Sequence, residues 1–186
     1  MIECFLKLKY FYPNEYRKTI YDVDFKKLND NGLEFVLIDL DNTLIPYDQE
    51  RPDEKIRTMI LQLKRQFKNV MIISNNHESR VKMFCDDLDC LYVYSAKKPL
   101  KSGFKKALKQ LNVLDPKKVV LIGDQFMTDV FGGNRMGFYT IVVDAIKRRS
   151  EKWYTKINRR LEMKMMKRLK RRDPKFYQAN NLSEKR

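Results

Sequence analysis

The sequence has few of the residues that stabilise small secreted domains or bind zinc. It contains three cysteines, none in a C-x-x-C pair, and one histidine, which argues against both a disulfide framework and a zinc site. No apolar run approaches the roughly 20 residues of a membrane-spanning helix. Lys7 and Lys9 interrupt the apolar N-terminal segment, which argues against a signal peptide. The expected setting is therefore reduced and cytoplasmic.

Positive charge is the most abundant feature. The 186 residues include 39 Lys or Arg against 24 Asp or Glu, a net charge of +15. Residues 147–172 hold thirteen of these basic residues and only two acids, a local net charge of +11. Such a surplus indicates a polyanionic partner, either nucleic acid or an anionic membrane surface.

Five short apolar runs predict the strands of a buried parallel sheet. Each is 4–5 residues long, and most are continuous rather than alternating, as in strands covered on both faces. The intervening stretches have helical periodicity, which favours repeated βαβ units and an α/β fold. The predicted strands are 35–39, 70–74, 91–94, 119–123 and 139–143.

Two segments flank this predicted core, which spans residues 33–146. Residues 1–32 are expected to pack on the core as an extension, with a short helix around 15–20 and a turn at Asn31-Gly32. Residues 147–186 are predicted to be a basic, largely helical tail that is frayed beyond residue 172. Large side chains recur every fourth residue along it and give a helix an apolar stripe: Trp153, Ile157, Leu161, Met165 and Leu169.

Two carboxylates follow the first predicted strand. Asp39 and Asp41 are two apart on an extended chain, so they point to the same side. Their mutual repulsion favours a cation between them, and hard oxygen ligands at a strand end suit Mg²⁺. A simple polar turn would account for Asp41 but not for an acid at Asp39, the end of an apolar strand.

Polar residues also end three other predicted strands or loops. Each has an ordinary interpretation as a helix cap, a turn or a surface lysine when taken alone. Ligands of doubly wound sheets bind beyond the carboxyl ends of the strands, so these groups would share one crevice with Asp39 and Asp41. Acids for a metal, with a hydroxyl and an ammonium for phosphate, are typical of phosphoryl transfer. The candidates are Ser74, Asn75, Lys98, Asp124 and Asp129.

The order of these motifs resembles the haloacid dehalogenase superfamily of phosphohydrolases. D-x-D-N-T at 39–43, S-N-N at 74–76, K-P at 98–99 and G-D-x-x-x-x-D at 123–129 match its four motifs. Together with A-K-K-P at 96–99, G-G-N-R at 132–135 and T-K-I-N-R-R at 155–160, they resemble the YqeG-like subfamily of type IIIA phosphatases. That subfamily is related to phosphatidylglycerophosphate phosphatases. The resemblance implies a Rossmann-like three-layer α/β/α sandwich with a five-stranded sheet of order 3-2-1-4-5.

The resemblance also implies a role for each motif residue. Asp39 would be the nucleophile and Asp41 the general acid and base. Ser74 would bind the phosphoryl group with Asn75, and Lys98 would neutralise charge and hold the phosphate. A Mg²⁺ ion would be held by Asp39, Asp41 through its carbonyl, Asp124 and Asp129, the last directly or through water.

Spacing between the motifs leaves no room for a cap domain, because 41–70 and 74–98 each fit only a helix with a loop or strand. An uncapped site would admit a phosphate on a lipid or macromolecule, and the subfamily's relatives make a lipid phosphate monoester the leading substrate. The basic tail has three open interpretations: peripheral contact with the anionic inner face of a membrane, binding to RNA or the ribosome, and packing on the core. The oligomeric state is not fixed by the sequence.

Overall fold

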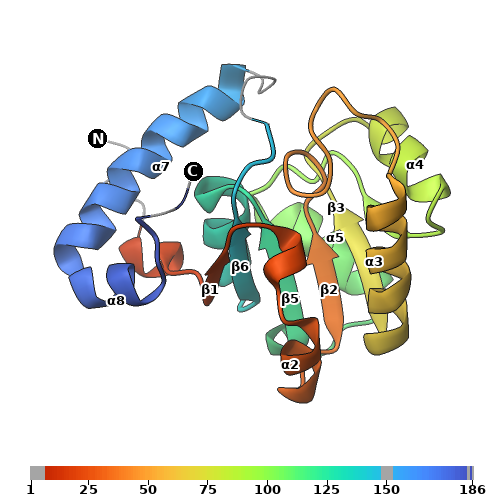
Figure 1. Ribbon diagram of the computed structural model, residues 1–186, viewed down its shortest axis with the longest axis horizontal. Coiled ribbons are helices and arrows are strands. Elements are labelled where there is room, and N and C mark those ends of the chain that lie inside the picture. The colour runs from red at the N-terminus through yellow and green to blue at the C-terminus, as the bar shows by residue number, and fades with distance from the viewer. Residues whose placement is uncertain (1–6, 148–152, 184, 186) are drawn as a thin grey trace.

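Six parallel strands form a single sheet within the described part of the chain (Figure 1). The computed structural model describes residues 7–147, 153–183 and 185, without the side chains of 153–158. The strand order is β1-β6-β5-β2-β3-β4. The strands are β1 (Glu15–Arg17), β2 (Phe35–Ile38), β3 (Asn69–Ile73), β4 (Leu91–Val93), β5 (Val119–Gly123) and β6 (Tyr139–Val143).

The five predicted strands and their order are confirmed, but the sheet has a sixth strand that the sequence analysis missed. The helix predicted around 15–20 is wrong, because Glu15–Arg17 forms edge strand β1 paired with β6. Tyr16 is buried while its charged neighbours are only partly covered, as expected at a sheet edge. Asn14 fixes the register, since its side chain accepts from the Thr140 N–H and its own N–H donates to Thr140 O, both at 2.8 Å.

Helices cover both faces of the sheet, which confirms the three-layer sandwich (Figure 1). One buried cluster joins α2, α3 and α4 to Val36, Ile38 and Val70 of the sheet, and the opposite face packs on α5. The helices of the core are α2 (Phe25–Asp30), α3 (Glu54–Gln66), α4 (Glu78–Asp86), α5 (Lys101–Gln110), the π-helix η4 (Phe126–Val130) and α6 (Phe131–Asn134), with 3-10 turns η1 (Leu8–Phe11), η2 (Ile20–Asp22) and η3 (Pro116–Lys118).

Helix α3 shows how the local sequence sets these elements. Asp53 caps its first turn by accepting from the Ile56 N–H at 2.9 Å. Four residues at helical spacing then form its buried face: Ile56, Met59, Ile60 and Leu63. This helix and a loop are the whole connection between β2 and β3, and α4 alone joins β3 to β4. The core is therefore capless, as predicted.

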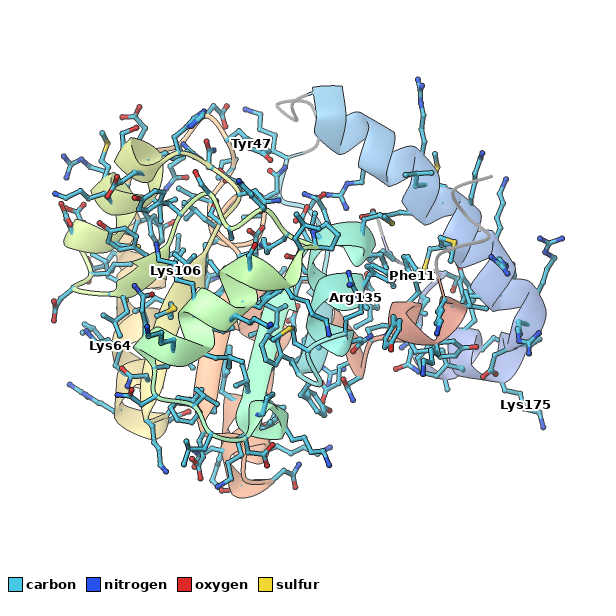
Figure 2. All side chains as sticks on the ribbon, turned by 180° about the vertical axis from the view of Figure 1, so that it is seen from behind. Phe11, Tyr47, Lys64, Lys106, Arg135 and Lys175 are labelled. Atoms are coloured by element: carbon cyan, nitrogen blue, oxygen red, sulfur yellow. The ribbon has the colours of Figure 1, made fainter. Side chains whose placement is uncertain are left out.

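The C-terminal segment forms α7 (Trp153–Arg172) and α8 (Pro174–Ala179). Met165 and Leu169 of α7 are buried beside η1 and η4, in the region of Phe11 in Figure 2. The prediction of a frayed end is wrong, because Asp173 caps α8 and Leu182 is buried. The side chains of Trp153 and Ile157 from the predicted stripe lie outside the described residues. The segment boundaries at 32 and 146 stay predictions.

None of the described helices combines the length and apolar character needed to cross a bilayer.

Candidate active site

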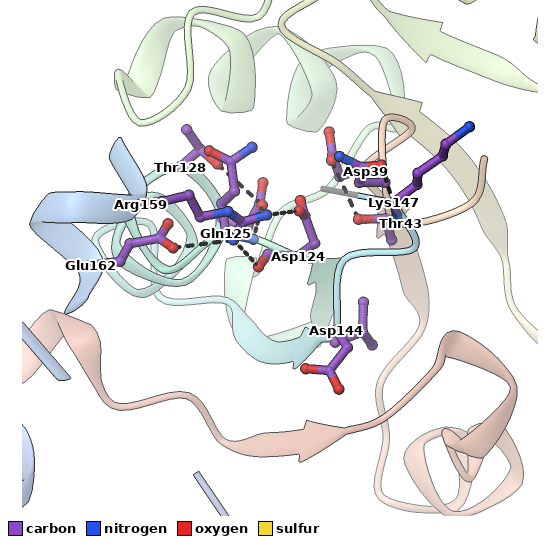
Figure 3. Close-up of polar contacts among 12 residues, drawn as sticks. Asp39, Thr43, Asp124, Gln125, Thr128, Asp144, Lys147, Arg159 and Glu162 are labelled. Atoms are coloured by element: carbon purple, nitrogen blue, oxygen red, sulfur yellow. Dashed lines mark hydrogen bonds and ion pairs between the residues drawn. The ribbon is translucent and has the colours of Figure 1, made fainter. Parts of the chain in front are cut away.

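The ends of two neighbouring strands bring the first acids together. Residues Ile38 of β2 and Ile122 of β5 are paired, and the Asp39 N–H donates to Ile122 O at 2.9 Å. Asp39 and Asp124 therefore leave the same edge of the sheet side by side (Figure 3). Asp129, from η4, completes a buried cluster in which one oxygen of each acid lies within 4.8 Å of the others. The structure thus unites three of the four acids predicted for the metal.

Lys98 lies between two of these acids. Its Nζ is 2.6 Å from Asp39 Oδ1 and 2.7 Å from Asp129 Oδ1. The Asn75 side chain holds the backbone of Lys98, accepting from its N–H at 2.6 Å and donating to its carbonyl at 3.0 Å. Asn75, predicted to bind phosphate, therefore positions the loop that carries the lysine.

Burial and charge act in opposite directions on this cluster. Burial raises the pKa of Asp39 well above its usual range against the effect of Lys98, and the nearby Asp129 and Asp124 raise it further. Burial alone would lower the pKa of Lys98, but the carboxylates of Asp129 and Asp39 outweigh it and the pKa is raised. Lys98 therefore stays charged and offsets part of the negative charge.

A glycine makes room for Asp129. The Asp129 Oδ2 atom accepts from the Gln125 N–H and from Thr128 Oγ1, both at 3.1 Å. A Cβ atom on Gly123 would lie 2.3 Å from Asp129 Cγ, far inside van der Waals contact. The glycine of the G-D motif is therefore required by the close approach of this carboxylate.

Asp41 lies apart from the acid cluster, in its own set of donors. Arg80 Nε donates to Asp41 Oδ1 at 2.7 Å, while Ser74 Oγ and Asn76 Nδ2 donate to Oδ2, both at 3.2 Å. The predicted metal contact of Asp41 is made by its backbone carbonyl, not by this carboxylate, so it stays a prediction. Ser74 and Asp41, both predicted site residues, are brought into direct contact.

The loop after β2 turns sharply to place these acids. Asn42 has a φ of 64°, in the left-handed region that asparagine tolerates better than most residues. Its N–H donates to Ile45 O at 2.7 Å, and its carbonyl accepts from the Ile146 N–H at 3.0 Å. Thr43 Oγ1 lies 3.4 Å from Asp39 Oδ2, a long hydrogen bond.

Two charged residues of α7 that the sequence analysis did not select also reach the site (Figure 3). Arg159 pairs with Asp124 through Nη2 and Oδ2, and its Nη1 donates to the Asp124 carbonyl at 2.9 Å. Glu162 accepts from Arg159 Nη1 at 3.1 Å. The sequence held a signal for each: Arg159 lies in the T-K-I-N-R-R motif at 155–160, and Glu162 is one of only two acids among the thirteen basic residues of 147–172.

The donor set fits a divalent cation such as Mg²⁺. Asp124 Oδ1 is buried and has no hydrogen-bond partner among the described residues. The buried acids of this part of the site are Asp39, Asp124, Asp129 and Glu162, and the described cations that act on them are Lys98, Arg159 and Lys185. One negative charge is therefore unbalanced when all four acids are ionised. Hard carboxylate oxygens are the ligands that Mg²⁺ prefers.

An α/β core with paired acids and a lysine beyond its strand ends defines a class of phosphate-ester hydrolases. A model of haloacid dehalogenase-like hydrolases matches residues 5–137. The chain therefore belongs to that family.

Similarity to individual proteins shows which branch of the family the chain belongs to. The chain is 35% identical over 164 residues to "Probable phosphatase YqeG" of Bacillus subtilis, covering 88% of this chain and 94% of that protein. It therefore lies in the YqeG-like branch of the family's phosphatases, as its motifs predicted. It is also 24% identical over 166 residues to "Phosphatidylglycerophosphate phosphatase 1, chloroplastic/mitochondrial" of Arabidopsis thaliana, covering 84% of this chain and 47% of that protein.

Similarity to solved structures is weaker. An uncharacterized protein from Listeria monocytogenes serotype 4b is 20% identical with a TM-score of 0.49, covering 62% of this chain and 84% of that one.

Proposed function

We propose that the protein is a Mg²⁺-dependent phosphomonoesterase that forms an aspartyl-phosphate on Asp39 and acts on an exposed, lipid-borne phosphate. The observation that carries this proposal is the buried cluster of Asp39, Asp124 and Asp129 around Lys98. Asp39, Asp124 and Asp129 would hold the Mg²⁺ ion. When bound, Mg²⁺ supplies positive charge that offsets the charge developing on the phosphoryl oxygens.

The residues perform two displacement steps. A carboxylate oxygen of Asp39 bonds to phosphorus while the ester P–O bond breaks, and the leaving oxygen takes a proton from the Asp41 carboxyl group. Asp41 then takes a proton from water as the water oxygen bonds to phosphorus, and the bond from Asp39 to phosphorus breaks to release inorganic phosphate. Oδ2 of Asp41 would leave Ser74 and Asn76 for the leaving oxygen while Arg80 keeps Oδ1 in place, and Ser74 is then free to bind the phosphoryl group.

Three features support a lipid-borne phosphate. The core has no cap domain to enclose a small metabolite, and one relative is a phosphatidylglycerophosphate phosphatase. Helix α7 also exposes a row of basic residues suited to contact with an anionic bilayer. These are Arg160, Lys164, Lys167, Arg168, Lys170, Arg171 and Arg172. Lys175, just beyond them, points away from the body in Figure 2.

The nucleophile is tested with p-nitrophenyl phosphate, by measuring phosphate release in Mg²⁺ and in EDTA. We expect Asp39→Asn to lower kcat by at least about 1,000-fold, because an amide cannot attack phosphorus. Asp89→Asn is the matched control, since Asp89 is exposed and its φ of 47° suits asparagine. Activity that survives Asp39→Asn would contradict the nucleophile assignment.

The substrate class is tested by comparing phosphatidylglycerophosphate in vesicles with soluble glycerol 3-phosphate. We expect kcat/KM to favour the lipid by at least about tenfold, since a bilayer adds contacts for the basic face of α7. Equal values would contradict a lipid substrate. Salt-sensitive RNA binding without hydrolysis of any phosphoester would instead support an RNA- or ribosome-associated protein.

A further inference from the structure

Two buried charged residues of α7 lie at the acid cluster although neither was predicted to be a site residue. Arg159 is 8% exposed and Glu162 is 5% exposed, unlike the basic residues on the outer face of the same helix. Burying a charge costs free energy unless the charge is paired and hydrogen-bonded. The contacts that Arg159 and Glu162 make should therefore show what they do at this position.

The contacts of Arg159 fix one carboxylate in one orientation. Its guanidinium reaches Asp124 at two points, with Nη2 at Oδ2 and Nη1 at the backbone carbonyl. A planar group bound at two points restricts the rotation of its partner far more than a single ammonium would. The other oxygen, Oδ1, is left buried and without a hydrogen-bond partner among the described residues.

Glu162 extends this arrangement to the second acid. Its Oε2 accepts from Arg159 Nη1 at 3.1 Å, and its Oε1 accepts from the Met127 N–H at 3.0 Å. Met127 belongs to η4, the π-helix that also carries Asp129. The two α7 side chains therefore contact both segments that supply acids from the end of β5.

We propose that Arg159, held by Glu162, is a positioning residue that turns Asp124 so that its Oδ1 faces the Mg²⁺ site. The inference rests on the proposed function, because it assumes that Asp124 binds the metal there. It makes α7 part of the metal site, beyond any role of its outer face in binding an anionic partner.

The alternative role for Arg159 is electrostatic competition with Mg²⁺, and the test must distinguish it from positioning. A guanidinium near a cation repels it, so an arginine that only competed with the metal would weaken Mg²⁺ binding. Arg159 occupies Oδ2 and the backbone carbonyl and leaves Oδ1 open, which favours positioning. The two roles predict opposite signs when the side chain is removed.

Calorimetric titration of the full-length protein with MgCl₂ measures that sign without any assay of activity. We expect Arg159→Ala to weaken Mg²⁺ binding by about 10- to 100-fold, the usual cost of losing an outer-sphere partner of a metal ligand. Arg160→Ala is the matched control, because Arg160 is the next residue on the same helix and is exposed. Arg159→Lys keeps the charge but not the two-point contact, and we expect it to fall between wild type and Arg159→Ala.

Glu162→Gln provides a second variant should Arg159→Ala not fold. It removes one acceptor of Arg159, while the amide oxygen still accepts the hydrogen bond from the Met127 N–H. We therefore expect a smaller loss of Mg²⁺ affinity than in Arg159→Ala. In kinetics, both variants should need more Mg²⁺ for half-maximal rate and recover part of kcat at saturating Mg²⁺. A merely structural role would lower the melting temperature in EDTA and leave the dependence on Mg²⁺ unchanged.

The outcomes separate this inference from the proposed function. Mg²⁺ binding equal to or tighter than wild type in Arg159→Ala would overturn the positioning role while leaving a Mg²⁺-dependent enzyme in place. Wild-type protein that binds no Mg²⁺ and releases no phosphate would overturn the proposed function, and the inference with it.

Discussion

The carboxylates of Asp41 and Asp124 lie beyond the ends of neighbouring strands and are both buried, yet their surroundings differ. Both oxygens of Asp41 accept hydrogen bonds, from Arg80, Ser74 and Asn76. Asp124 has Arg159 at one oxygen and no hydrogen-bond donor among the described residues at the other. A carboxylate with donors at both oxygens is held in one orientation, whereas an incomplete set leaves a place for a cation.

Removing the incompletely satisfied acid should have the largest effect. We expect Asp124→Asn to abolish Mg²⁺ binding in calorimetry and to lower kcat/KM by about 1,000-fold or more, because several kcal/mol of charge stabilisation are lost. Asp89→Asn again serves as the control. An Asp124→Asn enzyme with unchanged Mg²⁺ affinity would show that the open oxygen does not bind the metal.

Disturbing the fully satisfied acid should leave metal binding intact. Arg80→Ala removes the ion pair with Asp41, and we expect kcat to fall by about 10- to 100-fold as the positioned acid loses its orientation. Mg²⁺ affinity should match that of Arg65→Ala, an exposed arginine on α3. Equal losses of Mg²⁺ affinity and of rate would mean that the two halves of the site are not separate.

The pH dependence of stability should report on the acids of the proposed metal site. Burial raises the pKa of Asp39 and of Asp124, against the opposing charges of Lys98 and Arg159. Their contribution to the stability of the metal-free protein is therefore present below the unfolded-state pKa of about 4. It is lost as the pH rises through the raised pKa values of the folded state.

Mg²⁺ should restore that stability only where these acids are ionised. At a concentration of 100 times Kd we expect a gain of about 2.7 kcal/mol at pH 7.5, and a smaller gain at pH 5 where protons compete. Thermal unfolding with MgCl₂ or EDTA at both pH values measures this difference. The same gain at both pH values would show that protons do not compete with the metal.

The weakest contact should give the smallest effect. Thr43 Oγ1 is 3.4 Å from Asp39 Oδ2, so we expect Thr43→Ala to lower kcat by no more than about fivefold. Thr43→Ser, which keeps the hydroxyl, is the control. A loss as large as that of Arg80→Ala would show that this hydroxyl has a direct part in the reaction.

The sequence predicted the elements that local pattern determines. Continuous apolar runs marked the five central strands, and acids at strand ends marked Asp39 and Asp124. Edge strand β1 was missed because two of its three residues are charged and its pairing partner lies over 120 residues away. Helix α8 was missed because none of its own residues is buried: Phe176 and Tyr177 are only partly covered, and the buried Leu182 lies beyond its end.

Parts of the site depended on tertiary contacts that no spacing encodes. The four motifs indicated which acids matter but not that Asp41 faces Arg80 and Ser74. They also gave no reason to choose Arg159 from a row of basic residues, because its burial depends on how α7 packs against η1 and η4.

The pairing of β1 with β6 has a consequence for how the chain folds during its synthesis. Tyr16 and Asp144 are hydrogen-bonded across 128 residues of sequence. During synthesis, the N-terminal strand emerges first but has no partner until the rest of the sheet has been translated. A nascent chain that ends before residue 139 lacks β6 and therefore carries an unpaired β1 segment.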